Sequence, residues 1–408
     1  MNTFQKAVLS LVALFFSLAV SPGLKADVVV VKIPDPVLED SIRLELQMFG
    51  GDLWVSDLEK LTQLNIPLEW HINNKNVADL SGLEYCINLT TLNLHHNEIT
   101  DLSPLAGLEK LEVLDLTSQC CEWNSPCSGI SDLSPLQNLK KLRVLKLSVN
   151  DISDIEPLRG LTSLTKLQLS QNHFSDLTPL SELTNLTSLD ISGNAVIDLG
   201  PLVGLVNLTD LDIGGNDITD ITALSSMVSL ETLDFGGNNV SDIKPLTGLT
   251  HITEMSAYYN EIVDISPIAR FHELENLKLG DNDIIDTTAL TELTGLKVLD
   301  LMDNDITDIN PISNLIDLTV LSVCSNEITD ITPLAGLINL HYVDISQNQI
   351  FDLTPLLENP GIGEGDTLLV WSLAFNNNDY REQMHDLRNR GVIFSDFWAW
   401  IYVPEDYW

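Results

Sequence analysis

The stretch LTSLDISGNAVIDLGPLVGLVN, residues 186–207, decides the fold of this 408-residue chain because it is one copy of a repeating unit. The unit has the pattern L-x-x-L-x-L-x-x-N-x-I-x-D-L-x-P-L-x-x-L-x-x, with other aliphatic residues at some of the leucine and isoleucine positions. A fixed period of this kind is typical of solenoids, in which each unit stacks on the next. The asparagine of the pattern recurs every 22 residues, at Asn150, Asn172, Asn194, Asn216, Asn238, Asn260, Asn282, Asn304, Asn326 and Asn348.

Each position of the unit has a physical role. In the L-x-L segment, alternate residues of a short strand point into the core, and successive strands pair in parallel about 4.8 Å apart. We expect the Asn side chain to satisfy backbone amides after the strand, and the Asp four residues later to cap a helical turn opened by the next Pro. The unit resembles the leucine-rich repeat. The predicted fold class is therefore an α/β solenoid, a horseshoe with a parallel sheet on its concave face.

The aspartate of the unit recurs along the array and indicates about 13 repeats. At the strand spacing, such an array is roughly 60 Å long on its inner face. Two units carry Lys75 and Gln119 in place of the asparagine, both near the N-terminal end, where repeats are often atypical. The aspartates are Asp79, Asp101, Asp132, Asp154, Asp176, Asp198, Asp220, Asp242, Asp264, Asp286, Asp308, Asp330 and Asp352.

Segments on either side of the array are expected to cap the open ends of its core. Residues 33–47, IPDPVLEDSIRLELQ, place Pro-Asp-Pro before an amphipathic helical pattern. Residues 356–394 predict a strand, a helix from Asn378 to Arg390 that stops at Gly391, and a second strand. The aromatic stretch that follows, DFWAWIYVPEDYW, is expected to pack on this cap. The predicted division is a signal peptide at 1–26, a helical cap at 27–66, the array at 67–357 with an insertion at 120–128, and a C-terminal cap at 358–408.

The N-terminal segment, 1–26, and the net charge predict the compartment and limit the partners. MNTFQKAVLSLVALFFSLAVSPGLKA has a Lys, an apolar run and the helix breakers Pro22 and Gly23, as a secretory signal peptide does. No later segment has the about 18 uninterrupted apolar residues of a membrane span. We expect an exported protein that is secreted, periplasmic or peripherally attached to a cell surface. A net charge of -39 repels phosphate backbones, so nucleic acid is not an expected partner.

Three segments resemble the internalin-type leucine-rich repeat proteins of bacteria: ITDLSPLAGL at 99–108, ITDITPLAGL at 328–337, and the cap sequence IPDPVLEDSI with VSDLEKLTQL at 55–64. The resemblance covers nearly all of the chain after the predicted signal peptide. It implies a non-enzymatic protein that binds a protein partner through its concave face. The sequence has no LPxTG wall-sorting motif and too few residues after the array for an immunoglobulin-like module, so we expect recognition without wall anchoring.

Residues that alternate with the core leucines of each strand are expected to line the concave face. In the middle units, aspartates stack at one strand spacing beside glycines that carry no bulk, and two tyrosines follow. Tyrosine is a frequent interface anchor, so this arrangement predicts a docking strip for a basic segment of a partner protein. The candidate binding residues are Asp190, Asp210, Asp212, Asp234, Glu254, Tyr258, Tyr259, Met302 and Tyr342.

Other interpretations of this surface stay open. The aspartates are equally well explained as a solvated acidic surface, and the tyrosines also suit sugar stacking in a carbohydrate-binding or structural cell-surface protein. A calcium site is a further alternative at the rim, where strands end near Asp281, Asp283, Asp303 and Asp305. The sequence lacks G-x-S-x-G, H-E-x-x-H and phosphate-binding Gly-Lys motifs, so we expect neither catalysis nor a cofactor.

The stretch CCEWNSPC, residues 120–127, lies in an insertion, because the step from Asp101 to Asp132 is longer than the regular step of the repeat. We expect it to leave the solenoid at the rim, where extra residues do not disturb the core. Export favours a disulfide from Cys120 or Cys121 to Cys127, which would hold Trp123 outward as a second contact. The alternative is a zinc site completed by His95 or His96.

The two remaining cysteines are predicted to have different environments. Cys86 takes a core-leucine position and is expected to pack as a small apolar residue. Cys324 takes a concave-face position.

Overall fold

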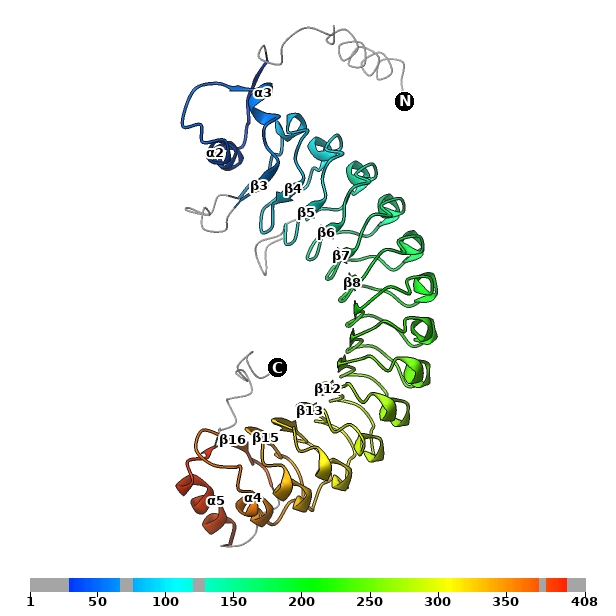
Figure 1. The fold of residues 1–408 in the computed structure, drawn as a ribbon, viewed down its shortest axis with the longest axis vertical. Coiled ribbons are helices and arrows are strands. Elements are labelled where there is room, and N and C mark those ends of the chain that lie inside the picture. Colours follow the sequence, from blue (N-terminus) through cyan, green and yellow to red (C-terminus); the bar gives the residue numbers. More distant parts are fainter. Residues whose placement is uncertain (1–28, 67–75, 120–128, 374–378, 395–408) are drawn as a thin grey trace.

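In the computed structural model, residues 29–66, 76–119, 129–373 and 379–394 are described, and they form one curved solenoid (Figure 1). Strands β3 to β17 lie in sequence order in a single parallel sheet of 15 strands along the concave side of the arc. Short helices follow the strands on the convex side. The predicted horseshoe with a parallel concave sheet is confirmed.

The repeat strands are three residues long, and from β6 to β15 each residue pairs with its counterpart in the next repeat. The first strand, β3, falls inside the segment predicted as the N-terminal cap. The strand bounds are β3 Gln63–Asn65, β4 Thr91–Asn93, β5 Val113–Asp115, β6 Val144–Lys146, β7 Lys166–Gln168, β8 Ser188–Asp190, β9 Asp210–Asp212, β10 Thr232–Asp234, β11 Glu254–Ser256, β12 Asn276–Lys278, β13 Val298–Asp300, β14 Val320–Ser322 and β15 Tyr342–Asp344.

Each unit returns along the convex side through a single 3-10 turn, because so short a repeat leaves little room for a longer helix. The predicted Asp cap is present: Asp101 Oδ1 accepts the Ser103 N–H at 2.8 Å, and the same bond recurs along the array. The turns are Leu83–Tyr85, Ser103–Leu105, Ser134–Leu136, Glu156–Leu158, Thr178–Leu180, Gly200–Leu202, Thr222–Ser226, Lys244–Gly248, Ser266–Arg270, Thr288–Leu290, Asn310–Asn314 and Thr332–Gly336.

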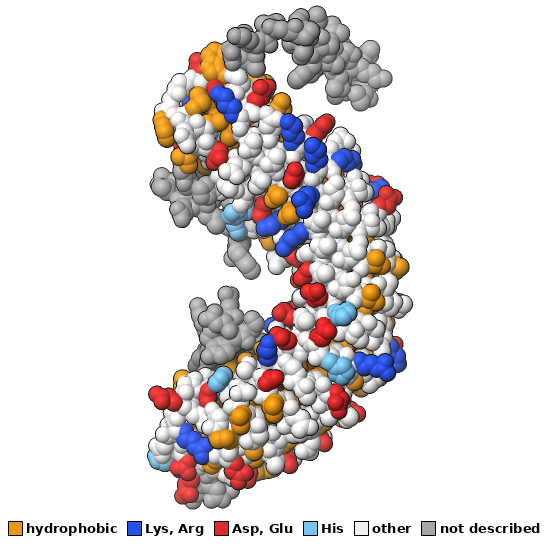
Figure 2. Space-filling model, viewed as in Figure 1, with side chains coloured by type: hydrophobic (Ala, Val, Ile, Leu, Met, Phe, Trp, Pro, Cys, Tyr) orange, Lys and Arg blue, Asp and Glu red, His pale blue; other side chains and the backbone are white. Residues whose placement is uncertain are grey.

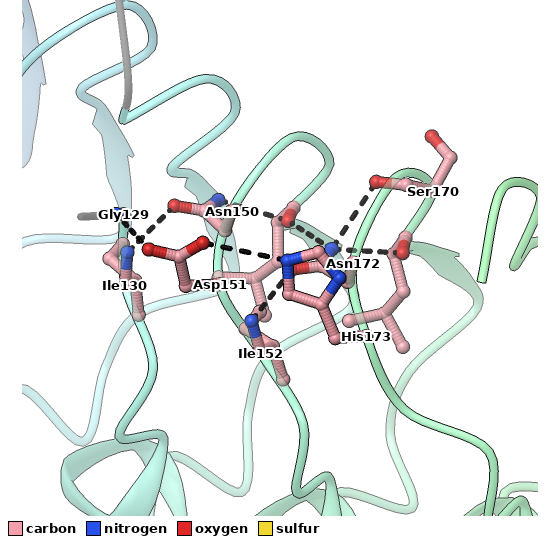
Figure 3. A network of polar contacts seen from close by, with 10 residues as sticks. Gly129, Ile130, Asn150, Asp151, Ile152, Ser170, Asn172 and His173 are labelled. Atoms are coloured by element: carbon pink, nitrogen blue, oxygen red, sulfur yellow. Dashed lines mark hydrogen bonds and ion pairs between the residues drawn. The ribbon is translucent and has the colours of Figure 1, made fainter. Parts of the chain in front are cut away.

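The repeat asparagines, called the asparagine ladder, bind neighbouring units together (Figure 3). Asn172 donates to the carbonyls of Leu147 at 3.0 Å and Leu169 at 2.9 Å, and its Oδ1 accepts the Ile152 N–H at 3.0 Å. Gln119 makes the equivalent contacts in the third unit, so that departure from the pattern preserves the function of the ladder. Lys75 lies outside the described residues. The ladder supplies the hydrogen bonds that buried backbone groups need and cannot obtain from water.

The N-terminal cap closes the first end of the core. Strands β1 (Val30–Val31) and β2 (Leu53–Trp54) pair antiparallel, and helices α2 (Pro36–Glu45) and α3 (Val55–Leu58) cover the leucines behind β3. Asp35 begins α2 as expected for Pro-Asp-Pro: its Oδ1 accepts the N–H groups of Val37 and Leu38. Its Oδ2 accepts the Ala78 N–H at 3.0 Å, which ties the cap to the array.

The C-terminal cap contains α4 (Thr354–Glu358), β16 (Thr367–Leu369), α5 (Asp379–Asn389) and β17 (Ile393–Phe394). The predicted strand, helix and second strand are therefore present, and Gly391, with φ +90°, follows the helix. Gln383 of α5 accepts the Leu353 N–H at 3.0 Å and so fixes the helix on the last repeat. Within the described ranges, no helix is long and apolar enough to cross a membrane. The predicted signal peptide and the stretch DFWAWIYVPEDYW lie outside these ranges.

Candidate functional site

Three aspartates form a row across neighbouring strands at the middle of the concave face. Asp190, Asp212 and Asp234 occupy the same register position on β8, β9 and β10. We call them the acidic row. Each carboxylate is oriented by the backbone two residues later, because its Oδ1 accepts the N–H of Ser192, Gly214 or Gly236 at 2.8–3.1 Å. Figure 2 shows acidic side chains gathered along the inner edge at the middle of the arc.

The acidic row concentrates charge where water is partly excluded. Burial raises the pKa of Asp212 to about 6, and the neighbouring carboxylates of Asp234 and Asp190 add to the effect. Burial also raises the pKa of Asp234. Both carboxylates are therefore less stable as anions than they would be in water, and a cation placed over the row would relieve this cost.

Tyr258 and Tyr259 follow the acidic row on the next strand and turn. The ring of Tyr258 lies over Gly236, and a Cβ added to this glycine would lie 2.4 Å from the tyrosine Cε1. The two tyrosine rings meet edge to face, with centroids 5.9 Å apart. The side chains are 42% and 61% exposed, which is unusual for large aromatic residues. The predicted neighbourhood of acidic and aromatic side chains is thus present.

The other candidate residues spread over a wider area. Asp210 and Glu254 are exposed at the first position of β9 and β11, beside the acidic row. Met302 is half-buried and packs over Gly280, where an added Cβ would lie 2.7 Å from the methionine Cγ. Tyr342 is half-buried on β15, toward the C-terminal end of the sheet. These two do not adjoin the acidic row.

Lys278 is a charged residue of this face that the sequence interpretation missed. Lys278 lies on β12, in register between Ser256 and Asp300. It lowers the pKa of both Asp234 and Asp300, against the larger effect of burial, so it is electrostatically coupled to the carboxylates on either side. This lysine lies one repeat period before Asp300, so the sequence alone is enough to place it on the concave face.

The concave face changes character at β13. Asp300 on β13 and Asp344 on β15 are buried, and burial raises the pKa of Asp300 to about 6. On β14, Val320 is 2% exposed and Ser322 is 5% exposed. Cys324 follows at the register position of Tyr258, as predicted for the concave face, yet it is fully buried. The sequence pattern did not predict this burial.

The calcium alternative receives no support from the described residues. In these ranges no group of three or more His, Cys, Asp and Glu side chains could hold a metal ion, and the four rim aspartates proposed for calcium lie within them. Asn282 and Asn304 point into the ladder as expected. Cys86 is a buried free thiol, in agreement with its predicted core position.

The cysteine-rich insertion is anchored to the solenoid at both ends, although Cys120, Cys121, Trp123 and Cys127 lie outside the described residues. Gln119, before it, belongs to the asparagine ladder. Gly129, after it, donates its N–H to Asp151 Oδ2 at 2.6 Å (Figure 3). A Cβ on Gly129 would lie 3.0 Å from the Asn150 backbone, so this return point favours glycine.

Comparisons with known proteins agree with this architecture. The family model "Leucine Rich repeats (2 copies)" matches residues 87–138, 140–182, 184–226, 294–336 and 316–358. A sequence search of curated proteins found no match. The crystal structure of an internalin (inlF) from Listeria monocytogenes is 36% identical, with a TM-score of 0.75, and the alignment covers 85% of this chain and 96% of that one.

Two further solved structures share the fold at lower identity. A leucine-rich repeat protein of Leptospira interrogans is 20% identical over 84% of this chain and 97% of its own, with a TM-score of 0.60. The functional domain of InlJ from Listeria monocytogenes, which includes a cysteine ladder, is 20% identical over 82% of this chain and 80% of its own, with a TM-score of 0.55.

Proposed function

We propose that this chain, which belongs to the internalin family of leucine-rich repeat proteins, is an exported recognition protein that binds a protein partner through its concave face. The partner presents a basic segment. This segment lies across the acidic row, and the tyrosine pair anchors it at one side. The N-terminal segment, 1–26, directs export, and the protein acts by binding and not by catalysis.

The observation that carries this proposal is the acidic row beside Tyr258. The pKa of Asp212 is raised to about 6, so its charge is costly in the free protein. A Lys or Arg of a partner would pair with the row and remove that cost, which favours basic partners over neutral ones. Tyr258 and Tyr259 add an exposed aromatic surface next to the charge, and tyrosine is enriched at interface hot spots.

A binding experiment with aromatic variants tests the proposal. The chain is used as bait against extracts of neighbouring cells, and the captured protein is then titrated against wild type and Tyr258→Ala/Tyr259→Ala. We expect the double variant to bind at least about tenfold more weakly, since hot-spot aromatics contribute about 1–2 kcal/mol or more each. Phe351→Ala, which also removes an exposed aromatic ring, is the matched control outside the concave face. Equal affinity of the double variant and wild type would refute the tyrosine anchor.

A carbohydrate ligand is the second candidate, because the exposed edge-to-face tyrosines also provide a surface for sugar stacking. A glycan array distinguishes the two. Binding to defined glycans that Tyr258→Ala/Tyr259→Ala abolishes, without any protein captured by the wild type, would favour a carbohydrate-binding cell-surface protein over a protein receptor.

A further inference from the structure

The positive charges of this acidic chain gather in one part of the array. Residues 140–146, KKLRVLK, hold four of its 20 Lys and Arg residues. The next repeat adds Lys166, and Figure 2 shows basic side chains together on this arm. The first three basic residues of the stretch are exposed, and Lys146 and Lys166 are half-buried. A cluster of positive charge therefore lies within a strongly acidic chain.

Lys146 and Lys166, which we call the lysine pair, lie on the concave face beside the acidic row. Lys146 takes the third position of β6, the same position that the acidic row takes on β8 to β10. Lys166 takes the first position of β7 and is in register with Ser188 of β8 and Asp210 of β9. The face therefore changes from basic on β6 and β7 to acidic on β8 without an intervening strand.

The pKa values of two aspartates differ in accordance with this change. Burial raises the pKa of Asp115 on β5, but hydrogen bonds at Thr117 and the Lys146 ammonium outweigh burial and hold this pKa below its usual range. At the same strand position on β9, burial and the neighbouring carboxylates raise the pKa of Asp212 to about 6. Lys146 Nζ lies 3.1 Å from Asp115 Oδ2, whereas Lys166 forms no ion pair with any residue that the structure describes. The charge of Lys166 is thus available to a partner.

The spacing of the two charged regions suits one short segment of a partner. The centre of the lysine pair lies between β6 and β7, and Asp212 on β9 lies two to three strand spacings away, about 12 Å. Four residues of an extended chain span about 13 Å. We propose that the partner segment carries an acidic stretch about four residues from its basic stretch, and that it crosses β6 to β10 with the acidic stretch over the lysine pair. This inference rests on the proposed function and adds the order of charges in the partner.

This order of charges gives the segment one orientation. A segment bound the other way round would place its cations at the lysine pair and its carboxylates at the acidic row. A purely basic segment would meet like charge at the lysine pair alone. Like charges brought together in an interface disfavour the wrong partner or orientation, so the lysine pair contributes specificity where the acidic row contributes attraction.

Two synthetic peptides test this arrangement. The two-charge peptide contains three glutamates, one glycine and three lysines in that order, and the basic peptide has glycine in place of each glutamate. Both carry a fluorophore and are titrated into the full chain, into Lys146→Gln/Lys166→Gln and into the control Lys244→Gln/Lys297→Gln. The control loses the same charge from exposed positions outside β6 to β10, and Lys297, like Lys146, is in an ion pair.

Non-specific attraction to so acidic a chain would favour the basic peptide. We expect instead that the two-charge peptide binds at least about threefold more tightly, that the lysine-pair variant loses this preference, and that the control keeps it. A basic peptide that binds equally or more tightly overturns the inference, and so does a preference that survives in the lysine-pair variant. A photo-crosslinker on the glutamate end is the second readout. It should attach within residues 143–168, and attachment at the acidic row overturns the inference.

A third variant separates this inference from the proposed function. If Asp190→Asn/Asp212→Asn/Asp234→Asn weakens neither peptide, the acidic row is not the binding site and both proposals fail. If this variant weakens both peptides but the unmodified chain shows no preference for the two-charge peptide, the acidic row stands and only the order of charges is wrong.

Discussion

At the scale of single residues, Asp212 shows that a charged side chain on the concave face can lower the stability of the fold. Its carboxylate is hydrogen bonded to the Gly214 N–H, yet burial raises its pKa from 3.8 to about 6. Because the folded state holds the proton more tightly than the unfolded state, the stabilisation is fully present below pH 4 and is lost as the pH rises through 6. At neutral pH the fold therefore holds this carboxylate as an anion at a cost in stability.

The change Asp212→Asn removes this charge and keeps an oxygen for the Gly214 N–H. We expect the variant to be more stable than wild type by about 1–3 kcal/mol at pH 8, with the difference falling to near zero at pH 4. Urea unfolding at both pH values measures it. Asp217→Asn, an exposed residue of the same repeat, is the control and should change stability little at either pH. A variant that is equally stable or less stable at pH 8 would contradict the assigned burial.

A second residue-scale feature is the left-handed backbone before each ladder asparagine. Gly193, Gly215 and Gly237 adopt it without strain, but Val149 has φ +60°. A β-branched residue is disfavoured there by about 1–2 kcal/mol, whereas Asn tolerates the conformation well. Val149→Asn should therefore raise stability by about 1 kcal/mol, seen as a higher denaturation midpoint. Gln171→Asn, at an unbranched residue with φ +52°, should gain less; a larger gain there would argue against strain as the cause.

At the scale of the repeat unit, the asparagine ladder explains why the period does not vary. Asn216 donates to the carbonyls of Ile191 and Ile213, and its Oδ1 accepts the Val196 N–H. These groups are buried, so a unit of different length would leave them without partners. The long insertion is tolerated because it lies between Gln119 and Gly129, outside the ladder contacts.

Asn216→Ala should consequently cost about 2–4 kcal/mol, because it leaves several buried backbone groups unsatisfied at once. Hydrogen exchange should show the loss first in the amides of the adjoining units. Asn194 offers an internal comparison, since its Oδ1 is buried without a hydrogen-bond partner among the described residues. Asn194→Ala should cost less than Asn216→Ala, and the reverse order would contradict the count of lost bonds.

Most of the unit could be predicted from the sequence because its period leaves one arrangement possible. Leu189 and Ile191 are buried and Asp190 faces the concave side, as alternation requires. Burial of Cys324 could not be predicted, because alternation gives the side of the sheet on which a residue lies but not what covers that side. Lys278 was predictable from the period and was overlooked. The contact of Tyr258 with Gly236 depends on a rotamer, which the pattern does not determine.

At the scale of the whole molecule, the concave face has three regions of different chemistry. Toward the N-terminus, Lys146 pairs with Asp115 at 3.1 Å, and basic side chains are visible on this arm in Figure 2. The acidic row and the tyrosine pair follow in the middle. The concave surface of β13 to β15, where Asp300, Val320 and Asp344 are buried, completes the arc. The single sheet places the three regions in sequence order along the arc, so a partner lying along this face would meet them in that order.

The central claim, that the acidic row binds the partner, is tested most directly by the affinity of the captured protein for three chains measured side by side. These are wild type, Asp190→Asn/Asp212→Asn/Asp234→Asn, and the exposed rim control Asp217→Asn/Asp283→Asn/Asp305→Asn, which loses the same charge. We predict that the acidic-row variant binds about tenfold or more weakly and loses most of its salt dependence, while the rim control stays within about twofold of wild type. Equal weakening by both variants, or none by either, would contradict a site on the concave face.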